Sequence, residues 1–164
     1  MQDDDKVLSK PRFGWTQVRF PGVPAISASY LTSVPIDLMA FADDYFSGKD
    51  AEMVLDSEGD YWEISCAGNK IDFRNCDELE YSVSIDEHYM RNLAQGAFDD
   101  IRENLFDWLV WECDADDIPA EYIDLLCGYL SKIYAHLYPG SAICPDFKQE
   151  ASATISLYLH KSRA

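Results

Sequence analysis

Basic residues are scarce in this chain: 13 Lys and Arg stand against 30 Asp and Glu, which leaves a formal net charge of −17 over 164 residues. A surface this negative repels phosphate backbones, so nucleic-acid binding through a basic face is excluded. Long apolar runs are lacking as well, since none approaches the roughly 18 residues of a membrane span. Met1 to Lys6 has neither the basic nor the apolar part of a signal peptide. The sequence therefore predicts an acidic, soluble, cytoplasmic protein.

The spacings that bind metals or nucleotides, or that form disulfide frameworks, are also missing. The five cysteines and three histidines are far apart, with no C-x-x-C pair and no H-E-x-x-H. There is no G-x-S-x-G, no phosphate-binding glycine loop and no dinucleotide fingerprint. Cys66 and Cys127 fall on apolar faces, where a free cysteine acts as a small buried hydrophobe. We therefore expect no catalytic residue, no metal site and no cofactor.

The composition is that of one folded domain. Apolar residues make up 48% and aromatic residues 13% of the chain, and a chain of this length buries about 70% of its unfolded surface. Residues 1–10 are polar and acidic with no apolar period, so we expect a flexible tail there. Residues 11–164 are then expected to form a single α+β domain.

Two stretches with strand character indicate the fold class. Trp15–Phe20 and Ala25–Leu31 predict a hairpin that turns at Pro21-Gly22. Over Ala51–Asp86 the apolar residues alternate, and short turns such as Gly68-Asn69 predict an antiparallel meander. We expect an antiparallel sheet of five or six strands, packed against helices on one side. The side chains expected to face the helices are Trp62, Ile64, Ile71, Phe73, Val83 and Ile85.

Helical spacing alternates with these strands. Ser33 can accept a backbone N–H as an N-cap, Pro35 suits the first turn, and Gly48 can close the same helix. Later apolar stripes predict a long helix over Glu87–Cys113 and a second helix after the break at Asp114–Asp117. Residues 147–158 fit a helical period, whereas residues 155–159 also alternate like a strand, and we favour the helix.

The longest acidic stretch lies around the end of the long predicted helix. Asp99, Glu103 and Asp107 are spaced four apart, so on one helix they share a face without neutralising partners. Such a run is often only a solvated surface, but it can also dock a basic protein and steer its approach. The candidate partner-binding residues are Asp99, Glu103, Asp107, Trp111, Glu112, Asp114, Asp116 and Asp117.

Three aromatic residues crowd the same region. Phe106, Trp108 and Trp111 lie within six residues and cannot all face one core stripe. Trp108 fits the stripe, while Phe106 and Trp111 lie to its sides. They either form a second packing layer, or Trp111 is an exposed anchor beside the acidic residues, of the kind found at interface centres.

A set of short segments carries a family resemblance. Ser29-Tyr30-Leu31, then Pro35 to Leu38, Gly48, Val54 to Gly59 and Tyr61 to Ile64 resemble small acidic immunity proteins of bacterial polymorphic toxin and contact-inhibition loci. The resemblance covers about residues 13–110. It implies a protein without catalytic residues that binds and neutralises a cognate toxin domain.

The leading function is therefore that of a non-enzymatic immunity protein that blocks a toxin by stoichiometric binding. Acidic side chains between Asp99 and Asp117 would pair with Lys and Arg of a basic toxin. One alternative is a secretion chaperone, which is also small, acidic and α+β but wraps an unfolded segment. Another is a small enzyme that uses a pair of carboxylates, which a buried pair with perturbed pKa values would favour.

Overall fold

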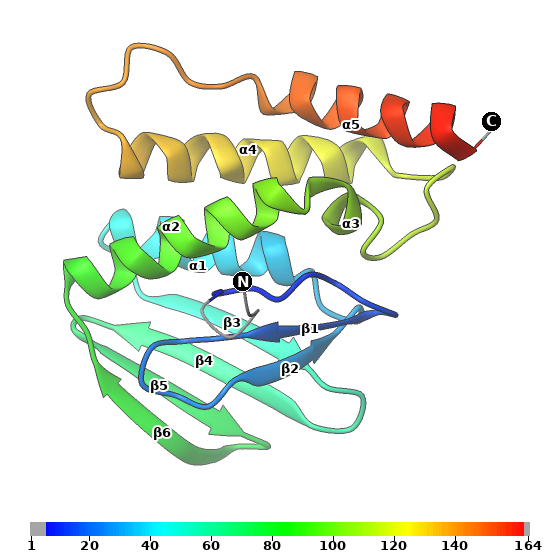
Figure 1. Cartoon of the computed structure of the whole chain (residues 1–164). Coiled ribbons are helices and arrows are strands. Elements are labelled where there is room, and N and C mark those ends of the chain that lie inside the picture. The colour runs from blue at the N-terminus through cyan, green and yellow to red at the C-terminus, as the bar shows by residue number, and fades with distance from the viewer. Residues whose placement is uncertain (1–5, 163–164) are drawn as a thin grey trace.

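The computed structural model describes residues 6–162 and shows an α+β fold (Figure 1). Six strands and five helices follow one another along this part of the chain. Their order is β1 (Trp15–Val18), β2 (Ile26–Ser29), α1 (Val34–Phe46), β3 (Ala51–Asp56), β4 (Tyr61–Ala67), β5 (Lys70–Asn75), β6 (Glu78–Ser84), α2 (Glu87–Glu103), α3 (Leu105–Leu109), α4 (Ala120–Leu137) and α5 (Phe147–Ser162).

The six strands are antiparallel, as predicted, and are divided between two sheets. β3 to β6 form a meander in sequence order, and β1 and β2 form a separate ribbon. Phe20, which follows β1, packs edge-on against Phe73 of β5 with ring centroids 5.0 Å apart, and also contacts Phe41 of α1. The ribbon therefore contributes side chains to the core between the sheet and the helices, and it does not extend the meander.

The inner face of the meander holds the alternating residues of the sequence pattern. Ile64, Ile71, Phe73 and Ile85 are buried, as expected, and Gly68 turns the β4–β5 hairpin with φ of +61°. Val83 is only partly buried and lies on β6, an edge strand of this sheet. Trp62 on the inner strand β4 is also only partly buried, and its ring stacks on Tyr81 of β6 with centroids 6.2 Å apart. Figure 1 shows α1 and α2 over the strands, and α4 and α5 as a further layer beyond them.

Helix α1 begins and ends where the sequence indicates, although its first residue is held differently. Pro35 occupies the first turn, and Gly48 follows the helix with φ of +72°. Ser33 makes no side-chain cap to the helix; its hydroxyl donates instead to the carboxylate of Glu112, which lies far along the chain. The predicted cap is therefore wrong, and Ser33 joins α1 to the loop after α3.

The predicted helix over Glu87–Cys113 is wrong beyond Glu103. Asn104 leaves helical geometry, with φ of −115° and ψ of 33°, and its side-chain amide donates to the carbonyl of Asp100 at 3.1 Å. Asparagine competes for helix carbonyls in this way, which interrupts the hydrogen-bond ladder. The chain resumes as the short helix α3, so Asp107 does not lie on the same helix as Asp99.

The last two helices pack on each other. One face of α4 is buried, and it carries Leu126, Leu130 and Ile133. The final segment is a helix, so the strand alternative is wrong. Phe147 and Ala151 are buried at the start of α5. Near its end, the ring of Tyr158 stacks on that of Phe106 of α3 with ring centroids 4.0 Å apart.

Residues 6–10 are not the loose tail that the sequence suggests. Leu8 is completely buried, and its backbone N–H donates to the carboxylate of Asp100 at 2.9 Å. Ser9 and Val7 pair with β1 through backbone hydrogen bonds to Gln17 and Arg19, at 3.0 and 2.8 Å. This segment therefore lies along β1 like a third strand. Residues 1–5 of the expected tail lie outside the described residues.

Gly96 on α2 makes room for this N-terminal segment. A Cβ at position 96 would lie 2.6 Å from Cγ2 of Val7. Replacing a helical glycine by alanine normally raises stability by about 1 kcal/mol. Because of the clash, we expect Gly96→Ala to lower the free energy of unfolding by about 1 kcal/mol instead, measured by urea denaturation.

Gly128 on α4 is the matched control, since a Cβ there would meet nothing within 4 Å. Gly128→Ala should give the ordinary gain of about 1 kcal/mol. Combining Gly96→Ala with Val7→Ala should remove the clash and recover that gain. If Gly96→Ala alone stabilises the protein as much as Gly128→Ala, the segment is not held against α2.

Candidate functional site

The first half of the predicted acidic face is neutralised by the N-terminal segment. Glu103 pairs with Lys6, and Asp107 pairs with Lys10 at 3.2 Å. Asp99 is exposed and accepts a hydrogen bond from Gln95 at 2.9 Å. The expectation that these three acids lack neutralising partners is therefore wrong for Glu103 and Asp107, because residues 6–10 pack beside α2.

Trp111 is not an exposed anchor. It is 5% exposed, and its indole N–H donates to the carbonyl of Thr32 at 2.8 Å. Its ring lies 5.4 Å from the ring of the fully buried Trp108. Trp111 is thus a core residue that fastens the loop after β2 to the loop after α3, and the alternative of an interface anchor is withdrawn.

The second half of the acidic stretch remains exposed. Glu112, Asp114, Asp116 and Asp117 lie on the loop between α3 and α4, and all four are exposed. Within residues 6–162, no Lys or Arg forms an ion pair with any of them. The negative charge of the predicted site that has no basic partner is therefore carried by this loop and by Asp99 on α2.

Phe13 is an exposed residue that the sequence analysis did not single out. It is fully exposed, at 101%, on a two-residue turn closed by hydrogen bonds of 2.9 Å in both directions between Arg12 and Trp15. Phe13 has φ of +53°, and Gly14 follows with φ of +78°. A phenylalanine seldom adopts positive φ. The sequence therefore gives no indication that Phe13 lies at the tip of a tight turn with its ring exposed.

Other exposed apolar side chains lie beside this turn. Tyr30 and Leu31 follow β2 and are 48% and 59% exposed, and Trp15 at the start of β1 is 37% exposed. The backbone N–H of Tyr30 donates to the carbonyl of Gly14 at 2.9 Å, and a Cβ on Gly14 would lie 2.9 Å from the Tyr30 ring. Close contact between turn and ring therefore fixes these aromatics relative to one another.

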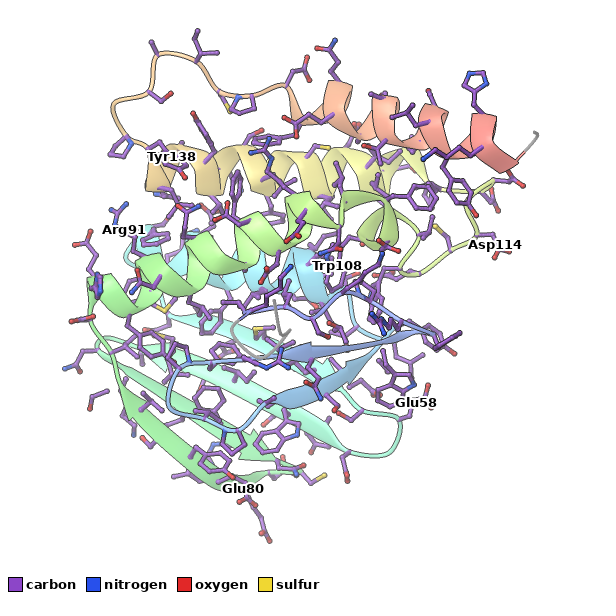
Figure 2. The ribbon with its side chains drawn as sticks, in the orientation of Figure 1. Glu58, Glu80, Arg91, Trp108, Asp114 and Tyr138 are labelled. Carbon is purple, nitrogen blue, oxygen red and sulfur yellow. The ribbon has the colours of Figure 1, made fainter. Side chains whose placement is uncertain are left out.

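Hydrogen bonds join the loops at this end of the molecule. Thr32 accepts the Trp111 indole N–H at its carbonyl, and its hydroxyl accepts the backbone N–H of Asp56 at 2.8 Å. Ser57 donates to the carbonyl of Ser27. We call residues 12–15, 30–33, 56–60 and 110–117 the loop end. In Figure 2, Asp114 and Glu58 mark two of its loops on the same side of the molecule.

Two carboxylates come close where α1 meets the loop end. Burial, and the nearby charge of Glu112, raise the pKa of Asp37 from 3.8 to about 6. Tyr122 is also buried here, where its hydroxyl donates to the carbonyl of Trp108 at 3.0 Å, and burial raises its pKa. Burial first, and the charge of Glu112 second, thus make the ionisation of Asp37 less favourable.

Comparisons with protein-family models, with curated proteins and with solved structures found no match. Within the described residues, no three His, Cys, Asp or Glu side chains are grouped so that they could hold a metal ion. No helix in that part of the chain has the length and apolar character needed to cross a membrane. The function must therefore be inferred from the loop end itself.

Replacing Trp111 by alanine should destabilise the protein. Removal of a buried tryptophan costs about 3–5 kcal/mol in stability, and the carbonyl of Thr32 would lose its donor. Trp111→Phe keeps most of the packing and should cost less. Chemical denaturation of both variants tests this expectation, and a loss below about 1 kcal/mol in Trp111→Ala would contradict the core position.

Asp37 should make stability depend on pH. Its pKa is higher in the folded protein than the ordinary 3.8, so the folded state holds the proton more tightly, and the contribution of Asp37 to stability falls as pH rises from about 4 to about 6. Asp37→Asn should therefore raise the free energy of unfolding at about pH 7.5 by on the order of 1–2 kcal/mol, allowing for partial exposure.

The gain from Asp37→Asn should shrink toward pH 4, where the folded carboxyl is protonated and the carboxyl of the unfolded chain is protonated in a large fraction of molecules. Denaturation at both pH values measures the difference. The exposed Asp50, changed to Asn, controls for removal of one negative charge. An equal gain from Asp37→Asn at both pH values would show that its ionisation does not set the effect.

Proposed function

We propose that this chain is a non-enzymatic immunity protein that neutralises a bacterial toxin by binding it stoichiometrically through the loop end. The observation that carries the proposal is Phe13, a fully exposed aromatic ring on a tightly closed turn. The resemblance of about residues 13–110 to immunity proteins favours the same class of function.

The exposed position of Phe13 lowers the stability of the fold, and no contact of its ring within the described residues compensates for this loss. Its ring is not buried, so it contributes no hydrophobic stabilisation. Positive φ in a residue other than glycine costs roughly 1–2 kcal/mol. A rigid aromatic side chain loses little entropy when a partner covers it, which is why interface centres favour such anchors. Trp15, Tyr30 and Leu31 extend the apolar area around Phe13.

The charge of the loop end selects a basic partner. Glu112, Asp114, Asp116 and Asp117 are exposed around the aromatic residues, as are Glu58 and Asp60 on the neighbouring loop. Opposite charges on a partner would speed its association and orient it. Toxins that act on nucleic acid carry such positive surfaces, because their substrates are polyanions.

The shape of the apolar area favours a folded partner over the secretion-chaperone alternative. A chaperone of that kind covers an extended segment along a groove, whereas the exposed aromatics of the loop end gather on adjoining turns held by hydrogen bonds. A compact patch of this kind suits a pocket on a folded domain.

The first test needs a candidate toxin domain, which is to be sought among the products of the genes next to this one. We expect it to form a one-to-one complex with this protein, measured by calorimetry, and to lose its toxicity to growing cells on co-expression. Phe13→Ala should weaken binding about 30-fold, as a typical hot spot does. Ile143→Ala is the matched control, because Ile143 is 79% exposed on the α4–α5 loop at the other end of α4.

The second measurement separates charge from the aromatic contact. Changing Asp114, Asp116 and Asp117 to Asn should slow association and flatten its salt dependence, with little effect on dissociation. Glu52, Glu78 and Glu80 changed to Gln remove the same charge from exposed strand positions. Equal effects of the two triple variants would contradict a docking role for the α3–α4 loop, and unchanged binding by Phe13→Ala would overturn the proposed surface.

A further inference from the structure

The outer face of the β1–β2 ribbon contains a hollow of about 490 Å³ that is unlike the rest of this acidic protein. Lys10, Arg12 and Arg19 supply three cationic side chains to its lining, together with Trp15 and polar residues such as Gln17. None of the described residues that line it is Asp or Glu. In a chain with more than twice as many acids as bases, this local composition requires an explanation.

Most basic side chains of the described chain already have a carboxylate partner. Those in ion pairs are Lys6, Lys10, Lys49, Lys70, Arg91, Arg102, Lys132 and Lys148. Within residues 6–162, Arg12, Arg19, Arg74 and Lys161 form no ion pair with a carboxylate, and of these four only Arg12 and Arg19 line the hollow. Two guanidinium groups thus remain in the hollow with their charges uncompensated by the described chain.

The two arginines differ in how they are held. Arg19 donates to the side-chain oxygen of Gln17 at 2.6 Å and to the carbonyl of Lys6 at 3.4 Å, which fixes its guanidinium over the ribbon. Arg12 is exposed beside the turn that carries Phe13. Lys10, at the rim, is partly neutralised by Asp107 at 3.2 Å. The positive charge that a ligand can use therefore comes mainly from Arg12 and Arg19.

The chemistry of these groups suits an anion with paired oxygen atoms, and the apolar surface beside them favours a carboxylate on an aliphatic side chain. A guanidinium donates two parallel hydrogen bonds to a planar carboxylate, and it does so best where it is held in place. The partly exposed indole of Trp15 offers an apolar surface for the methylene groups of an acidic side chain. The net charge of −17 repels an anion more strongly the more charges it carries, which favours a short anionic segment over a long polyanion.

We propose that this hollow binds a short acidic peptide segment, whose carboxylates pair with Arg12 and Arg19 while its aliphatic parts lie on Trp15. The site adjoins the loop end through Arg12 and Trp15. It does not depend on the immunity function, because a peptide can be tested without any toxin.

The test is a titration of the full chain, labelled with ¹⁵N, with a capped hexaglutamate peptide, followed by the amide signals in NMR spectra. We expect saturable shifts confined to residues 9–19 and to Ser27. Arg12→Ala should weaken binding of the peptide at least about tenfold, because a charge-assisted hydrogen-bonded pair is lost. Arg12→Gln combined with Arg19→Gln should abolish saturation.

Arg74→Ala is the matched control, since Arg74 is an exposed arginine on β5, and it should leave peptide binding unchanged. Absent shifts, shifts scattered over other basic residues, or full binding by the double variant would overturn the proposal. Tighter binding of a twelve-nucleotide oligothymidylate or of inorganic phosphate at the same amides would also overturn it, because the ligand would then be a phosphate.

Discussion

The buried carboxylate of Asp100 holds together the part of the protein on which both proposals rest. It accepts the backbone N–H of Leu8 and lies 3.9 Å from the ammonium group of Lys6. Burial raises its pKa, while these partners favour its charged form. Through this contact residues 6–10 lie along β1, Leu8 enters the core, and Lys10 and Arg12 reach their places around the ribbon.

The same docking distributes the charge of the molecule. Lys6 and Lys10 neutralise Glu103 and Asp107, so among the predicted site residues the acids left without a basic partner are Asp99 and those of the α3–α4 loop. On the other side of the turn at Phe13, the ribbon presents arginines without carboxylates. A protein with a large net negative charge therefore has an acidic surface and a basic hollow that adjoin at Arg12 and Trp15, and together they would fix the orientation of a partner as well as its affinity.

Local patterns in the sequence were enough to predict most elements, because alternation and helical spacing record which face of each element is buried. They correctly predict the meander, helix α1 and helix α4. The position of Trp111 could not be predicted in this way, since its burial depends on Thr32, 79 residues away in the chain. Nor could the exposure of Phe13, because its positive φ is imposed by the closed turn, nor the place of residues 6–10, which pair with distant groups on α2.

The outermost strand β6 has a consequence for how the protein behaves in a crowded solution. Its outer edge has no strand partner in the described chain, and open edges of this kind invite the strands of other molecules. The register of β6 slips at Phe73 and Arg74 of β5, and Glu78 and Glu80 are exposed along it. An edge that is interrupted and negatively charged pairs poorly with strands of other molecules. The edge of the sheet can therefore stay open to solvent without promoting aggregation.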